Sequence, residues 1–190
     1  DVYKRQLPMG LLGLGLNAEH LRFMLGVAFD FGAPFIFLGW LSFSYLCLHY
    51  LYSFFNDGVR QKLIDEWTNP FRRSFLPAVT LTAMLFILSL EQVLAARKDD
   101  LVYWLYPLVL LHLFLNFYLI NGWVFDDRVN LSDHIPSWFI LISGNFVSVI
   151  SLMSLKPDNA YIYELSLFFF SAGLILWLIF ATTLVYRVVF

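Results

Sequence analysis

Histidines are the residues of this sequence whose chemistry could include a metal ion or a haem iron. His20 and His134 fall between apolar runs, whereas His49 and His112 lie within them. A haem between helices needs two axial histidines at matching depth, and a rise of 1.5 Å per residue would separate His49 from His112 by about 10 Å. We therefore expect no metal and no cofactor, and we interpret these histidines as hydrogen-bonded residues at helix contacts.

One acid stands within an apolar run, about a turn and a half from its start. Asp30 is an ionisable residue at membrane depth, which is a functional hypothesis in its own right. It is therefore a candidate for coupling transport to protons or ions. The alternative is a solvated residue near the outer interface, where water and lipid headgroups reach it.

Uncharged polar residues are more informative than the charged ones. Hydroxyls, amides and helix breaks can stabilise a passing anion through dipoles without binding it too tightly to leave. A helix N-terminus exposed at a proline break would add partial positive charge. Hydroxyls also pack helices together, and that interpretation stays open. The residues concerned lie on the third and fifth apolar runs: Ser74, Thr80, Thr82, Ser143, Gly144 and Asn145.

The composition is that of a membrane protein. Hydrophobic residues make up 60% of the 190 residues and charged residues only 14%, against roughly 25% charged residues in a soluble domain. The mean hydropathy is +0.72. The net charge of −2 gives no sign of a nucleic-acid partner, and the single cysteine, Cys47, can form neither a disulfide framework nor a cysteine metal site. The expected surroundings are a lipid bilayer.

Apolar runs of helical length alternate with short polar stretches, and about 20 residues are needed to cross a bilayer. We predict an all-α polytopic protein with six spans and five as the fallback, the first span being the weakest because it is short and rich in glycine. Residues 1–6 are expected to be a non-native or disordered leader, and residues 7–190 part of a membrane domain. The predicted spans are 7–21, 25–54, 75–95, 101–122, 136–155 and 161–188.

Basic residues set the predicted orientation. With the N-terminus inside, eight basic residues fall on the cytoplasmic side and four on the outer side, which is the direction of the positive-inside rule. The N-terminus is therefore predicted to be cytoplasmic.

Proline and glycine recur in the first, third and fifth runs, whereas the even runs are smoother and more aromatic. Broken helices in membranes persist where they are buried in protein or line a water-filled cavity. The alternation favours an inner ring of odd spans and an outer ring of even spans. The plain alternative is that both residue types are common in membrane helices.

Three segments resemble a known family in order and spacing. Residues 69–77 and 135–145 are similar to its "H-P-x-R-S-S-F" and "P-x-W-[FI]-I-P-x-V-G-N" motifs, and residues 8–16 resemble its first-helix motif. The family is the tellurite-resistance/dicarboxylate transporter family, which includes bacterial tellurite-resistance channels and plant slow-type anion channels. The sequence departs from these motifs at Asn69, Arg73 and Leu141, where the family carries histidine, serine and proline.

The resemblance implies ten helices arranged as five hairpins around a central pore, of which this chain would hold about six as an N-terminal fragment. It also implies a homotrimer and transport of small anions such as chloride, nitrate, sulfite or dicarboxylates. We therefore predict an anion channel or carrier of the bacterial inner membrane, not an enzyme. The predicted ion pathway comprises Ser74, Phe75, Pro77, Thr80, Gly144 and Asn145.

Two other functions remain open from the sequence. A membrane-embedded b-type cytochrome or another membrane enzyme subunit would need His49 and His112 in one site. A non-transporting assembly subunit would need no site at all.

Overall fold

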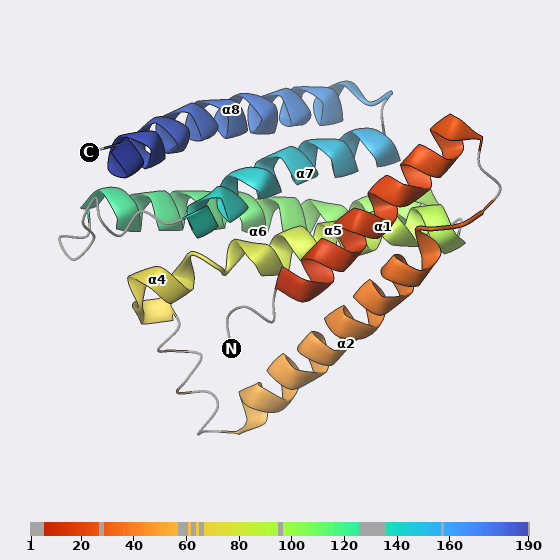
Figure 1. The fold of residues 1–190 in the computed structure, drawn as a ribbon, viewed down its shortest axis with the longest axis horizontal. Helices are drawn as coiled ribbons and strands as arrows, with labels where there is room; N and C mark the ends of the chain where they lie inside the picture. The colour runs from red at the N-terminus through yellow and green to blue at the C-terminus, as the bar shows by residue number, and fades with distance from the viewer. Residues whose placement is uncertain are drawn as a thin grey trace.

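The computed structural model describes residues 6–26, 29–56, 61, 64, 67–94, 97–125, 136–156 and 158–189, and throughout these ranges its regular structure is helical (Figure 1). The leader predicted over residues 1–6 lies outside them except for Gln6, which begins the first helix. The elements in chain order are α1 (Gln6–Leu25), α2 (Ala33–Phe55), α4 (Pro70–Arg73), α5 (Pro77–Leu94), α6 (Lys98–Phe125), the 3₁₀ turn η3 (Pro136–Trp138), α7 (Phe139–Leu155) and α8 (Ala160–Val189).

Five helices in the described part of the chain are long and apolar enough to cross a membrane: α2, α5, α6, α7 together with η3, and α8. The prediction of an all-α polytopic membrane protein is confirmed. The first apolar run, which the sequence made the weakest span, forms one unbroken helix of 20 residues, but it is not among those five.

The largest difference from the predicted spans is at the second helix, which begins at Ala33 rather than at residue 25. Gly26, whose φ of 64° lies in the left-handed region, follows the last residue of α1, and such a conformation is a common helix stop. Pro34 then lies in the first turn of α2, where its missing N–H costs nothing. Apolar character runs across the connection, so hydropathy alone could not place the break.

The long helices form three hairpins, α1 with α2, α5 with α6, and α7 with α8 (Figure 1). Helix α5 packs against both α1 and α7, so these three odd-numbered elements lie in a row. Helix α6 packs against both α5 and α7, whereas α2 and α8 cover α1 and α7. The predicted arrangement as helical hairpins is confirmed.

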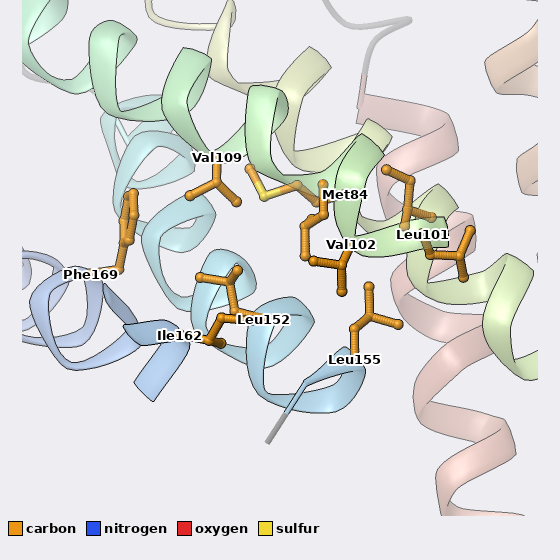
Figure 2. Packing of buried hydrophobic residues seen from close by; sticks show 10 residues of the cluster. Met84, Leu101, Val102, Val109, Leu152, Leu155, Ile162 and Phe169 are labelled. Atoms are coloured by element: carbon orange, nitrogen blue, oxygen red, sulfur yellow. The ribbon is translucent and has the colours of Figure 1, made fainter. Parts of the chain in front are cut away.

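The largest apolar cluster joins α5, α6, α7 and α8. Figure 2 shows Met84 and Val109 gathered with Leu152 and Phe169, all within one buried cluster. A second cluster lies where α6 ends and α7 begins: the rings of Trp123 and Trp138 stack with centroids 4.1 Å apart. Since lipid tails are as apolar as these side chains, close packing is what favours this association.

The α1–α2 hairpin depends on two glycines that let the helix backbones approach closely. A Cβ added to Gly15 would lie 2.5 Å from Ile36 Cγ1 and 2.9 Å from the Ile36 backbone nitrogen. A Cβ on Gly39 would lie 2.7 Å from Leu12 Cγ. Small residues at such crossings are typical of membrane helix contacts.

We predict that Gly15→Ala destabilises the hairpin by about 1–3 kcal/mol, the usual cost of overpacking, because the new methyl group meets α2 backbone. Thermal unfolding of the purified protein in detergent micelles, followed by circular dichroism, measures the change. Gly13→Ala is the matched control, since nothing lies within 4 Å of a Cβ at that position. Equal losses in both variants would contradict the close contact.

Candidate functional site

His112 lies at the centre of the packed helices and joins three of them. It belongs to α6 and is fully buried. Its Nδ1 lies 2.9 Å from Thr80 Oγ1 on α5, and its Nε2 lies 3.1 Å from the Leu141 carbonyl oxygen on α7. One side chain therefore links α6 to both neighbouring helices.

The protonation of His112 follows from its partners. A carbonyl oxygen can only accept, so Nε2 must carry a hydrogen, and in the neutral ring Nδ1 must then accept the Thr80 hydroxyl hydrogen. That hydroxyl also lies 2.9 Å from the Pro77 carbonyl oxygen, but it has one hydrogen to give. A doubly protonated ring would donate to Thr80 and leave the hydroxyl hydrogen for Pro77. The charge on His112 and the direction of the Thr80 hydroxyl are therefore linked.

One turn further along α6, Asn116 pairs with Asn145 of α7. Asn116 and Asn145 exchange two hydrogen bonds, each 3.0 Å between Nδ2 and Oδ1. Asn116 Nδ2 also lies 2.9 Å from the His112 carbonyl oxygen, and both asparagines are buried. Because residues four apart share a helix face, His112 and Asn116 together form a polar stripe on α6.

Small residues on α7 make room for this stripe. A Cβ on Gly144 would overlap the His112 ring, so the imidazole lies directly against α7 backbone. Ser148 donates to the Gly144 carbonyl oxygen at 2.8 Å, which keeps its own hydroxyl satisfied inside the helix. The His112 ring, the two asparagine amides and the Ser148 hydroxyl thus have their partners within the protein, as groups at membrane depth require.

The residues predicted for the ion pathway fall into two groups. Thr80, Gly144 and Asn145 face α6, where they take part in the contacts around His112 and Asn116. Phe75 instead packs with Ala78 and Ile140, with Met9 of α1 against them. That second group lies where α1, α5 and α7 meet.

The remaining pathway residues and their neighbours complete the distribution. Ser74 is fully buried and Pro77 begins α5 as a buried residue. Ser143 lies on the exposed face of α7 and donates to the Phe139 carbonyl oxygen of its own helix at 2.8 Å. Although the three residues are consecutive in the sequence, Ser143 therefore lies on a different face of α7 from Gly144 and Asn145.

Asp30 lies before α2 and not within it, so its predicted place inside a span is wrong. Its Oδ1 accepts from the Ala33 backbone N–H at 2.8 Å, and its Oδ2 lies 3.2 Å from Arg22 Nη1. Arg22 Nη1 lies 3.2 Å from Glu19 as well. Two hydrogen bonds hold the pKa of Asp30 below its ordinary value. The larger effect comes from Glu19 and the next from the Ala33 N–H.

Among the three histidines that the structure describes, no two lie together as haem ligands would. Both ring nitrogens of His112 have protein partners, and His49 lies on the exposed side of α2 beside Tyr45. His134 lies outside the described residues. Within the described part of the chain no three His, Cys, Asp or Glu side chains group as metal ligands would.

Asn116 is the residue of this buried polar site that sequence reasoning missed. The signal was present, because residues 112 and 116 are four apart on a helix whose charged residues are confined to its first turn. What the sequence lacks is the partner, since Asn145 is 29 positions away.

The fold and this site define a multi-pass α-helical membrane protein with uncharged polar contacts in its interior. A family model of voltage-dependent anion channels (SLAC1) matches residues 6–190. The chain belongs to this family, which confirms the resemblance drawn from the helix motifs, and the protein is accordingly an anion channel or transporter. No curated protein matches the chain.

The asparagine pair makes a direct test of the buried polar contact. Asn116→Leu and Asn145→Leu should each destabilise the protein, because each leaves the other amide without its partner. The double variant should lose less than the sum, with a coupling of about 0.6–1.7 kcal/mol as for other hydrogen bonds between membrane helices. Unfolding in detergent of the four proteins measures it. Additive losses would mean that the pair contributes nothing beyond its separate side chains.

Asp30 should stabilise the start of α2 in a pH-dependent way. We expect Asp30→Ala to cost about 0.5–2 kcal/mol at neutral pH, as loss of a helix cap does. Because the folded pKa is lowered, this contribution is present above the unfolded pKa of about 3.9 and is lost as the pH falls through the folded pKa. Asp30→Asn, which keeps the capping oxygen, should lose less stability and show no such pH dependence.

Proposed function

We propose that this protein moves small anions, of the chloride, nitrate, sulfite or dicarboxylate class, along the row formed by α1, α5 and α7. The observation that carries the proposal is the family match over residues 6–190. The row itself supports the location, since the three odd-numbered elements pack on one another while α2, α6 and α8 flank them. In this arrangement the odd-numbered helices of the three hairpins together form one wall of the proposed pathway.

The narrowest part of the pathway is proposed at Phe75. This side chain is buried at the junction of three helices and packs against Met9, Ala78 and Ile140. Apolar constrictions close membrane pores by excluding water. Ser74 and Pro77, which flank Phe75 on the chain, are proposed to line the same constriction, with the Ser74 hydroxyl offering a dipole to the anion.

The wall of the pathway is proposed to be supported on its α6-facing side by three residues, Thr80, Gly144 and Asn145. Each of them contacts α6 through a hydrogen bond or direct packing. These contacts fix how closely α5 and α7 approach α6, and hence the width of the pathway on the opposite side of the two helices. In this proposal they act on the anion through helix position, without contacting it.

Proton coupling is the second candidate mechanism, and the Asp30 group favours it. The neighbouring Asp30 raises the pKa of Glu19, whereas the pKa of Asp30 is lowered, so Glu19 takes up a proton before Asp30 does as the pH falls. Arg22 bridges them with 3.2 Å contacts to each. A proton held beside a cation at a helix end could be exchanged as an anion passes.

The sidedness and assembly are proposed from the sequence and the family. The distribution of basic residues supports a cytoplasmic N-terminus, the resemblance supports a homotrimer, and the bacterial inner membrane is the proposed location.

Anion flux into liposomes containing the purified full-length protein tests the function. Chloride, nitrate and malate are compared with and without a pH gradient. Flux that is independent of the gradient supports a channel, whereas malate flux that requires the gradient and disappears in Asp30→Asn supports a proton-coupled carrier. No flux of any anion from folded protein would overturn the proposed function.

Phe75→Ala should increase anion flux, because it removes the apolar side chain from the helix junction. A barrier lower by about 1.4 kcal/mol would raise the rate about tenfold. The control is Phe86→Ala on α5, since Phe86 packs against Trp40 and Phe43 of α2 and not at the junction. Equal effects of both variants would exclude a constriction at Phe75.

A further inference from the structure

A cavity of about 270 Å³ lies between α2, α5 and α6, away from the α1–α5–α7 junction. Helix α5 lines it with Val79 and Thr80, Leu76 lines it just before that helix, and α6 lines it with Leu111 and Leu115. The lining is completed by Tyr50, five residues before the end of α2, and by Trp67. The volume is close to the lower end of small-molecule sites, which begin at about 300 Å³.

The cavity lies at membrane depth and opens sideways. Leu111 is at the midpoint of α6, one of the helices able to cross the membrane. Val79 and Leu111 are 38% and 47% exposed, whereas Thr80 is only 2% exposed and forms the floor. Figure 1 shows α2 diverging from α5 and α6 toward its C-terminal end, the part of α2 that lines the cavity through Tyr50.

We propose that this cavity binds one acyl chain of a membrane lipid. Its lining is almost wholly apolar, and no charged side chain among the described residues takes part in it. The Thr80 hydroxyl is already engaged with His112 and Pro77. An anion would find no charged donor there, and the Tyr50 hydroxyl and the Trp67 indole N–H would replace only a small part of its hydration.

Other occupants fit the cavity less well. Apolar cavities of this kind stay dry, and an empty one loses dispersion contacts along its whole lining. A helix from a second copy of the chain, about 10 Å across with its side chains, could cover the opening and insert single side chains, but as a whole it could not enter a cavity of about 270 Å³. An acyl chain is narrow, apolar and present at this depth.

The aromatic residues indicate how the chain enters. Trp67 is 43% exposed, and it lines the cavity together with Tyr50. Rings with one polar atom prefer the level of the lipid headgroups. The chain therefore enters between these two rings and reaches inward along Val79 and Leu111 to the middle of α6.

A phosphatidylcholine with a photoreactive diazirine near the end of one acyl chain tests the proposal. The protein is reconstituted with this lipid in nanodiscs and irradiated, and the labelled residues are identified by mass spectrometry. We expect saturable labelling on α5 and α6 at residues 76–80 and 111–115, stronger than on the exposed surface of α8.

Leu111→Trp should fill the cavity and lower this labelling at least about tenfold, which corresponds to about two methylene groups no longer buried. Leu110→Trp is the matched control, because Leu110 is 61% exposed on the same helix and does not line the cavity. It should label as the unmodified protein does, and unchanged elution in gel filtration shows that both variants are folded.

Three results would overturn the proposal. The first is labelling spread evenly over all lipid-facing helices, which would mean ordinary surrounding lipid. The second is equal labelling of Leu111→Trp and Leu110→Trp. The third is a disulfide between two copies of the chain, formed through Leu111→Cys in a Cys47→Ala background, which would mean that a second copy covers the cavity.

Discussion

The structure depends on one constraint, that a polar group at membrane depth must find its partner inside the protein. Helix α6 meets this constraint for three helices at once. His112 reaches α5 through Thr80 and α7 through the Leu141 carbonyl, and Asn116 reaches α7 again through Asn145. Apolar packing alone would allow these helices to slide or rotate, because lipid satisfies an apolar face equally well. The hydrogen bonds select one register.

In that register, the two faces of α5 and of α7 make different contacts. One face of each helix is occupied by α6, with glycine and serine on α7 keeping the approach close. The other side of α5 takes part in the row with α1, where Phe75 closes the junction. A pathway along that row would thus be held in shape by contacts on the opposite side of its own wall. In the proposed arrangement, the hydrogen-bonded asparagines hold the wall of the pathway and do not contact the anion.

Much of the fold could be predicted from the sequence because apolar runs in a bilayer have few alternatives to helices. Helices α5, α6, α7 and α8 begin and end within three residues of the predicted spans. The second helix was misplaced because its preceding connection is itself apolar, and the break there comes from a left-handed Gly26 and the cap by Asp30. A hydropathy profile does not reveal local hydrogen bonds of this kind.

The sequence by itself determined that the chain is a multi-pass membrane protein, which of its apolar runs form long helices, and, through its motifs, the family to which it belongs. It also supplied polar residues on the third and fifth spans, but not the direction in which each side chain points. Only the tertiary structure decided that Thr80 and Asn145 turn to α6 while Phe75 meets α1 and α7. The physical reason is that hydropathy is summed along one chain, whereas a hydrogen bond between helices depends on the rotation and depth of two.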